Sequence, residues 1–340
     1  MRLFRHLMPA ALLVAALGAT AAPVPQQASP SPPQAAPALP PPVPLLWKVS
    51  DADNAVYVLG SFHLLKPDDY PLSPDVDAAF ADAERVAFEM PPEEMASPTL
   101  GIQMAQAAKR SDGTSLDSEL TPEVAARLKA WVEGNQALLQ AGRIDAQSLQ
   151  AFEPWFVAVT VSILEMTRMG LDPRLGLDAH FAQAAAQAGK QTAGLESGAQ
   201  QIAFLDGMDR GEQVQMLAEA LDESEEGRAE LERLHAQWRA GDEQGIWNGL
   251  AAEMQVKYPL LYRRINIERN DAWLPKIEQW LAADKDDTLL VVGALHTLGK
   301  DGIVEKLRAR GYEVERICSA CANPPRAAKP AAVPSPSPRD

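Results

Sequence analysis

Two segments near opposite ends of this chain share one pattern, in which an apolar run stops at a glycine and a histidine follows three residues later. The segments are residues 56–63 and 290–296, and they end in His63 and His296. Only five histidines occur in the whole sequence. An imidazole exchanges protons near neutral pH and also binds metal ions, so a matched pair indicates acid–base or metal chemistry. His63 and His296 are therefore our candidates for an active site.

The apolar runs are typical of buried strands, and a glycine at a strand end lets the backbone turn sharply or approach a ligand closely. Each histidine then lies at the carboxyl end of a strand, which is the edge of an open α/β sheet where ligands bind. Glu89 and Glu196 also fall at the ends of predicted strands. We interpret two other histidines, His180 and His235, as hydrogen-bonded core or surface residues.

The rest of the chain predicts an α/β fold, in which a mixed sheet is built from both ends of the chain around a large helical insertion. The first two strands form a hairpin around residues 50–54, and a helix begins after Ser73. Residues 93–283 are mostly helical, with Thr121 as a helix cap. A strand, a helix and a strand close the domain, which favours a parallel β-α-β crossover. The predicted strands are residues 45–49, 55–59, 85–90, 191–196, 288–293 and 312–317.

The two ends of the chain carry segments that we expect to lie outside the folded domain. Arg2 and Arg5, an apolar stretch and then small residues predict a secretory signal peptide. We therefore expect a periplasmic or secreted protein, with no membrane insertion after the signal is cleaved. The predicted divisions are a signal peptide at 1–21, a Pro/Ala-rich linker at 22–45, one domain at 46–321 and a disordered tail at 322–340.

Charge and cysteine usage restrict the partners and the redox chemistry. The formal net charge of −15 gives a surface that repels nucleic acid and anionic lipid, so we expect a peptide or small-molecule partner. The only cysteines are Cys318 and Cys321. In an oxidising compartment this pair predicts a local disulfide, in preference to a redox site or structural zinc. The oligomeric state is left open by the sequence.

Taken together, these residues resemble the TraB/PrgY/GumN family, whose animal relatives are the Tiki proteases. The likeness covers nearly all of residues 46–317, and the ordered set of motifs is much more specific than one Gly-x-x-His. The motifs are Leu46-Trp47-Lys48-Val49, Gly60-x-x-His63, Glu89, Leu177-Asp178, Gly194-Leu195-Glu196, Trp238 with Gly241-Asp242, Glu268-Arg269-Asn270, Gly293-x-x-His296, Gly299-x-x-Gly302 and Arg310-Gly311-Tyr312.

The resemblance implies a fold similar to that of the erythromycin-esterase and ChaN-like proteins. In Tiki proteins, the two Gly-x-x-His histidines and a glutamate are implicated in metal-dependent peptide cleavage, which implies a role here for His63, Glu89 and His296. Some bacterial members are linked to the shutdown of peptide pheromones and others to exopolysaccharide gene clusters. Membership therefore implies a site more directly than it implies a substrate.

Two imidazoles and a carboxylate, with one position left open, are the ligand set expected of a hydrolytic metal ion. His63, Glu89 and His296 would supply it, and manganese, cobalt, nickel or zinc would suit these donors. Glu196 is a candidate fourth ligand, or the general base that takes a proton from water. Arg269 would either polarise the scissile carbonyl or orient a glutamate through a bidentate bond. The leading hypothesis is thus an exported metal-dependent hydrolase that cleaves peptides.

Two alternatives remain open on the same residues. In metal-free hydrolysis, as in esterases of this fold, His63 acts as a base activated by Glu89, and His296 holds the oxyanion. In the non-enzymatic alternative, the protein is a periplasmic binding protein that holds a peptide or a saccharide without cleaving it. A serine hydrolase is disfavoured because the sequence has no Gly-x-Ser-x-Gly motif.

Overall fold

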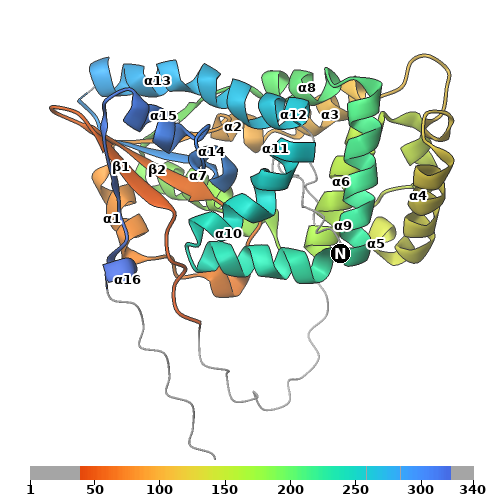
Figure 1. Cartoon of the computed structure of the whole chain (residues 1–340), viewed down its shortest axis with the longest axis horizontal. Helices are drawn as coiled ribbons and strands as arrows, with labels where there is room; N and C mark the ends of the chain where they lie inside the picture. The colour runs from red at the N-terminus through yellow and green to blue at the C-terminus, as the bar shows by residue number, and fades with distance from the viewer. Residues whose placement is uncertain (1–38, 258, 284, 323–340) are drawn as a thin grey trace, which may run out of the picture.

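The computed structural model describes residues 39–322, apart from residues 258 and 284. It contains a six-stranded sheet in the order β4-β3-β5-β2-β1-β6. Strands β1 and β2 of this sheet are labelled in Figure 1. The predicted mixed α/β fold is confirmed, and each predicted strand is present. The predicted signal peptide at 1–21 lies outside the described residues. The strands are β1 (Leu46–Ser50), β2 (Ala55–Ser61), β3 (Arg85–Phe88), β4 (Gln191–Gly194), β5 (Thr288–Gly293) and β6 (Glu313–Arg316).

The four strands β4, β3, β5 and β2 are parallel, so their carboxyl ends meet at one edge of the sheet. Ser61 of β2 is in register with Gly293 of β5, and Phe88 of β3 is in register with Val291 and Gly194. All residues of β2 and β5 are buried, as their continuous apolar runs predict. The parallel register therefore places the residues that follow these strands close together.

Strand β6 pairs antiparallel with β1 at the outer edge of the sheet, so β1 and β2 lie between it and β5. The connection from β5 through α15 (Ile303–Ala309) still leads to a strand that runs parallel to β5. The predicted crossover is thus present, but the two strands are not neighbours. The buried strand β2 pairs with β5, so the hairpin of β1 and β2 occupies the position beside β5 and separates it from β6.

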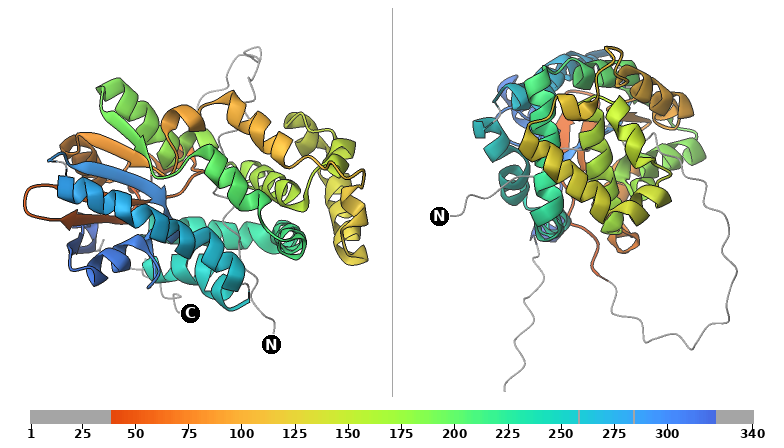
Figure 2. Two further views of the ribbon diagram at one scale, coloured as in Figure 1. Left: turned by 90° about the horizontal axis from the view of Figure 1, so that it is seen from above. Right: turned by 90° about the vertical axis from the view of Figure 1, so that its right-hand side faces the viewer.

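Helices cover both faces of the sheet and extend beyond one end of it. Helix α7 contacts β3, β4 and β5, whereas α13 contacts β2 and lies on the other side of the sheet (Figure 2, left). The longest helix, α9, packs along α6 at the end of the molecule away from α15 (Figure 1), and its C-terminal turn reaches the end of β2, where Trp238 contacts Gly60. The predicted helix start after Ser73 and the predicted cap Thr121 are both present, and each side chain accepts a hydrogen bond from the first turn of its helix.

The helices that matter for the site lie in the predicted helical insertion and after β5. Two segments of π-helix, which is rare in proteins and often marks functional sites, occur between α10 and α13, and the second of them leads directly into α13. The α-helices are α1 (Pro74–Asp82), α2 (Pro92–Met95), α3 (Pro98–Ala107), α4 (Pro122–Gly134), α5 (Gln136–Ala141), α6 (Pro154–Arg168), α7 (Leu177–Ala188), α8 (Gly198–Asp206), α9 (Arg210–Arg239), α10 (Glu243–Trp247), α11 (Glu253–Lys257), α12 (Pro259–Tyr262), α13 (Arg269–Ala283), α14 (Ala294–Thr297), α15 and α16 (Ser319–Ala322); the π-helices are η7 (Asn248–Ala252) and η8 (Arg263–Glu268).

Both ends of the described chain are fastened to the domain. The Val43 N–H, in the predicted linker, donates a hydrogen bond to the Arg239 carbonyl at 2.7 Å. Cys318 and Cys321 form the predicted disulfide. Ser319, between them, donates from its backbone N–H to the carboxylate of Asp75. Within residues 39–322, no helix combines the length and the apolar character needed to cross a membrane.

Candidate active site

The parallel strands bring His63, Glu89 and His296 together in the interior. The Nε2 atoms of both histidines lie 3.8 Å from the same oxygen, Oε1 of Glu89. The side chains of His63, Glu89 and His296 are only 12%, 7% and 6% exposed. A Cβ atom on Gly293 would lie 3.0 Å from His63 Nε2 and 3.1 Å from Glu89 Oε1, so a glycine at this position leaves the meeting point open.

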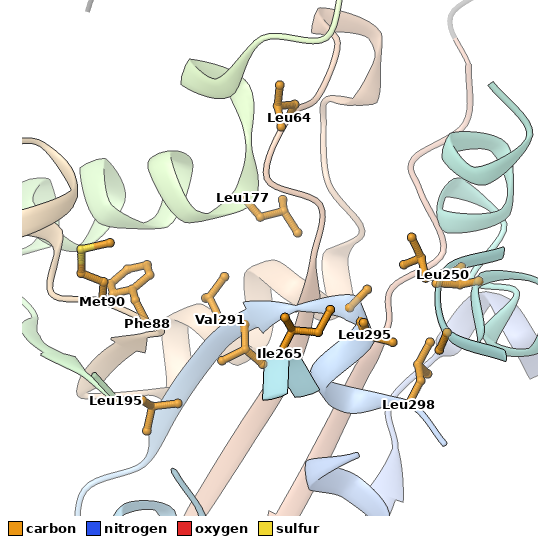
Figure 3. Packing of buried hydrophobic residues seen from close by; sticks show 14 of the residues in the cluster. Leu64, Phe88, Met90, Leu177, Leu195, Leu250, Ile265, Val291, Leu295 and Leu298 are labelled. Carbon is orange, nitrogen blue, oxygen red and sulfur yellow. The ribbon is translucent and has the colours of Figure 1, made fainter. Parts of the chain in front are cut away.

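Apolar neighbours anchor most of the polar residues of the site. A buried apolar side chain lies directly beside His63, Glu89, Asp178, Glu196 and His296 in the sequence, and several of these anchors surround the strand ends in Figure 3. Electrostatic interactions are stronger in such an apolar environment than in water, because the local dielectric constant is low. The anchors are Leu64, Phe88, Met90, Leu177, Leu195 and Leu295.

The ring of His63 is held by a carboxylate. Its Nδ1 atom lies 2.6 Å from Oδ2 of Asp178, which also accepts a hydrogen bond from Ser61 Oγ at 2.6 Å. A carboxylate accepts here, so the proton is on Nδ1 and Nε2 faces Glu89. Burial alone would lower the pKa of His63, but the charge and hydrogen bond of Asp178, together with the charge of Glu89, raise it to about 9.

Asp178 reaches His63 because the start of α7 presses against the backbone of that histidine. A Cβ atom on Gly176 would lie 2.0 Å from the His63 carbonyl oxygen, so this close approach requires glycine. The Leu177 N–H also donates to the Phe62 carbonyl at 3.3 Å. The helical insertion therefore supplies the partner of a histidine that follows strand β2.

The ring of His296 is held by an amide. Its Nδ1 lies 2.7 Å from Oδ1 of Asn270, whose Nδ2 donates to the Asp301 carbonyl at 2.8 Å. The Asn270 oxygen therefore accepts the Nδ1 proton of His296 and leaves a lone pair on Nε2. That lone pair faces Nη1 of Arg269 at 3.0 Å. Burial, followed by the positive charge of Arg269, lowers the pKa of His296 to about 3, so the ring is neutral at neutral pH.

Arg269 joins the two glutamates and His296. Its Nη2 donates to Glu89 Oε2 at 2.7 Å, and its Nε donates to Glu196 Oε1 at 3.0 Å. Glu196 also accepts from the indole N–H of Trp273 at 3.0 Å. Burial would raise the pKa of Glu89, but the charges of Arg269 and both histidines outweigh burial and lower it to about 2. Of the two roles predicted for Arg269, the structure displays the orientation of a glutamate.

The residues predicted to bind a metal ion are engaged by other groups. A metal ion on His296 Nε2 would compete with the Arg269 guanidinium, 3.0 Å away. Both oxygens of Glu89 accept hydrogen bonds, one from Arg269 and one from the Gly293 N–H. Over residues 39–322 without 258 and 284, no group of three or more His, Cys, Asp or Glu is arranged to hold a metal ion. The donors do not fit a metal ion as they are arranged here, and the divalent metal stays a prediction from the sequence.

The structure brings several of the predicted site residues together, but some of their hydrogen-bond partners differ from the predicted ones. His63, Glu89 and His296 converge, while Glu196 contacts Arg269 and Trp273. The partner of His63 Nδ1 is Asp178 rather than Glu89. His296 Nε2 accepts a hydrogen bond, so in this state it cannot donate one to an oxyanion.

Sequence reasoning assigned no role to Asp178 or Asn270. Both belong to motifs of the family resemblance, and these motifs were the signal that could have found them. Their contacts depend on where α7 and α13 begin relative to the sheet. That placement is a property of the tertiary fold, which spacing along one sequence does not give.

The chain is an α/β protein. Its buried imidazole, carboxylate and guanidinium groups form a polar site at the carboxyl ends of the parallel strands. The chain matches the TraB/PrgY/gumN family over residues 45–316 and belongs to that family. No curated protein and no solved structure matches the chain. The similarity to the erythromycin-esterase and ChaN-like fold therefore stays a prediction.

Proposed function

We propose that this protein is an exported hydrolase that cleaves peptide or ester bonds, with His63 as the acid–base residue. The observation that carries the proposal is the hydrogen-bonded pair of Asp178 and His63, whose Nε2 points toward Glu89. The 3.8 Å between Nε2 and Glu89 Oε1 is too long for a hydrogen bond, so His63 Nε2 has no hydrogen-bond partner among the described residues and can face a reacting oxygen beside Glu89. A base fixed by a carboxylate is the arrangement expected for general base catalysis.

In the proposed reaction, His63 Nε2 takes a proton from the attacking water as the oxygen bonds to the acyl carbon. Asp178 stabilises the imidazolium that forms. The tetrahedral intermediate then loses its alcohol or amine, which receives the proton from His63. Arg269 provides positive charge beside the site, where negative charge develops on the substrate. Glu89 stays ionised because its pKa lies at about 2, and it fixes Arg269.

The competing proposal is the metal-dependent peptidase, with Mn, Co or Zn on His63, Glu89 and His296. Its supporting observation is that both Nδ1 atoms are held by acceptors while both Nε2 atoms face one carboxylate oxygen. Outer partners of this kind usually orient metal-binding histidines. For this proposal to hold, Arg269 must withdraw from His296 Nε2.

The deciding experiment uses protein purified without a histidine tag and dialysed against EDTA. Hydrolysis of a fluorogenic peptide library and of nitrophenyl esters is measured with and without added Mn, Co or Zn, and the metal content is determined. We expect hydrolysis to survive EDTA. Loss in EDTA with recovery on metal addition would support the metal-dependent peptidase instead. Binding of a peptide or a saccharide without hydrolysis under all of these conditions would favour the binding protein.

A further inference from the structure

We infer that the C-terminal turns of α9 position His63 by clamping the segment that carries it, residues 60–69, which we call the His63 loop. The inference rests on the proposed function, because it treats His63 as the acid–base residue. Three residues of α9, at positions 235, 238 and 239, face this loop. They are spaced three and four residues apart, so they share one face of the helix. The clamp is separate from the groups that surround Glu89.

The carboxylate of Asp69 is the centre of the clamp. It is completely buried, and its Oδ2 accepts a hydrogen bond from His235 Nε2 at 2.8 Å. The same Oδ2 accepts from the Lys66 backbone N–H at 2.7 Å, while Oδ1 pairs with Arg239. A second bond from Arg239 reaches the Asp68 carbonyl at 3.1 Å. A buried charge with this many partners is costly to displace, so Asp69 fixes the far end of the loop to α9.

The near end of the loop is held by tryptophan. The indole N–H of Trp238 donates to the carbonyl of Gly60, the glycine of the first Gly-x-x-His motif, at 3.5 Å. The ring of Phe62, next to His63, lies 5.7 Å from the Trp238 ring and 6.3 Å from the His235 ring. His235 and Trp238 thus contact the loop on both sides of His63.

The segment that supplies Asp178 also contacts the loop. Leu65 and Asp172 exchange two backbone hydrogen bonds of 3.2 and 2.8 Å, and Gly176 contacts the His63 backbone. The separation between His63 and Asp178 therefore depends on α9 and on the start of α7 together. A displacement of about 1 Å in a catalytic group can reduce the rate by about 100-fold, so the clamp acts on turnover and not only on folding.

Three variants separate positioning from general stability. His235→Leu removes the donor to Asp69, and His235→Gln keeps an N–H at a comparable place. Gln213→Leu is the matched control, because Gln213 is another buried polar residue of α9 and donates to the Met208 carbonyl, away from the loop. Each variant is assayed well below its own unfolding temperature, with kcat and KM measured separately. Amide hydrogen exchange is followed at Lys66 and Asp69.

We expect His235→Leu to lower kcat by about tenfold or more while KM changes by less than about twofold, because a misplaced base affects the chemical step. Exchange at Lys66 and Asp69 should become faster. His235→Gln should restore both values, and Gln213→Leu should leave both unchanged. Equal kcat losses in His235→Leu and Gln213→Leu, or unchanged loop exchange in His235→Leu, would overturn the clamp. If the native protein hydrolyses nothing, the proposed function fails, and the exchange rates still decide whether α9 holds the loop.

Discussion

The two Gly-x-x-His motifs look alike in sequence, yet the structure gives their histidines opposite electrostatic environments. His63 donates from Nδ1 to the carboxylate of Asp178, and its pKa is raised to about 9. His296 donates from Nδ1 to the amide of Asn270 and lies beside the Arg269 guanidinium, and its pKa is lowered to about 3. One histidine is therefore cationic and the other neutral at neutral pH.

In each motif, the strand and the glycine determine where the imidazole lies, whereas residues from a neighbouring helix determine its pKa. Asp178 enters from α7, and Asn270 and Arg269 enter from the start of α13. A carboxylate beside an imidazole favours the charged ring, whereas a guanidinium disfavours it. His63 is thus equipped to hold and release a proton, and His296 to hold Arg269 in place.

The largest expected effect is the difference in kcat/KM between a variant without the His63 ring and a variant without the His296 ring. His63→Ala should lower kcat/KM by about 1,000-fold or more, because general base catalysis is lost. His296→Ala should lower it by only about tenfold, since this ring acts through Arg269. Initial rates on a cleaved peptide or ester measure both, with His180→Ala as a control that keeps full activity. Equal, near-complete losses accompanied by loss of bound metal would favour the metal-dependent peptidase.

The next effect concerns the group that makes His63 different. Asp178→Asn should lower kcat/KM by about 100-fold, because the ring loses its carboxylate and its preferred tautomer. In the native protein, kcat/KM should rise with pH up to an inflection near 9, since the base must be unprotonated. In the variant, the inflection should move toward the ordinary value of 6.5. A native profile that is already flat above pH 7 would contradict this assignment.

A smaller effect should follow from making the second motif resemble the first. Asn270→Asp places a carboxylate beside His296, which should raise the pKa of that ring from about 3. The new charge also competes with Glu89 for Arg269, so we expect a loss of about tenfold in kcat/KM. NMR titration of the ring protons measures the pKa. An unchanged His296 pKa in a folded variant would show that Asn270 does not control this ring.

The last effect is on stability, and the two histidines should act at opposite ends of the pH range. The folded pKa of His63 exceeds 6.5, so its contribution to the free energy of unfolding is complete below pH 6.5 and is lost as pH rises through about 9. The folded pKa of His296 is below 6.5, so its contribution is present above pH 6.5 and is lost as pH falls toward about 3. Urea unfolding of the native protein and the two alanine variants at pH 4, 6.5 and 9.5 tests the signs. The same pH trend in both variants would remove the contrast.

Much of the frame could be predicted from the sequence, because its signals are local. Apolar runs ending at Gly60 and Gly293 predicted strands β2 and β5, and parallel pairing then brought the strand ends together. The position of β6 could not be predicted in this way. It depends on which edge of the sheet the hairpin leaves free, which is decided by packing of the whole domain.

The roles within the site were less accessible to sequence reasoning than the site residues themselves. Arg269 was expected to polarise a substrate or to orient a glutamate, and the structure shows it bonded to Glu89 and Glu196. In the metal-free alternative, the partner of His63 was expected to be Glu89, but Asp178 holds that place. Each difference comes from a helix start pressed onto a strand end, as at Gly176, and no residue spacing records that contact.

We expect the paired motifs to hold one protonated and one neutral imidazole at neutral pH, and NMR titration of both histidines in EDTA-treated protein measures this difference. Nitrogen-15 shifts of the two rings would be followed across the pH range in which the fold persists, with His63→Ala and His296→Ala assigning the signals. His63 should stay protonated up to about pH 9, and His296 should stay neutral down to about pH 3. Two rings that titrate together near 6.5 would contradict it.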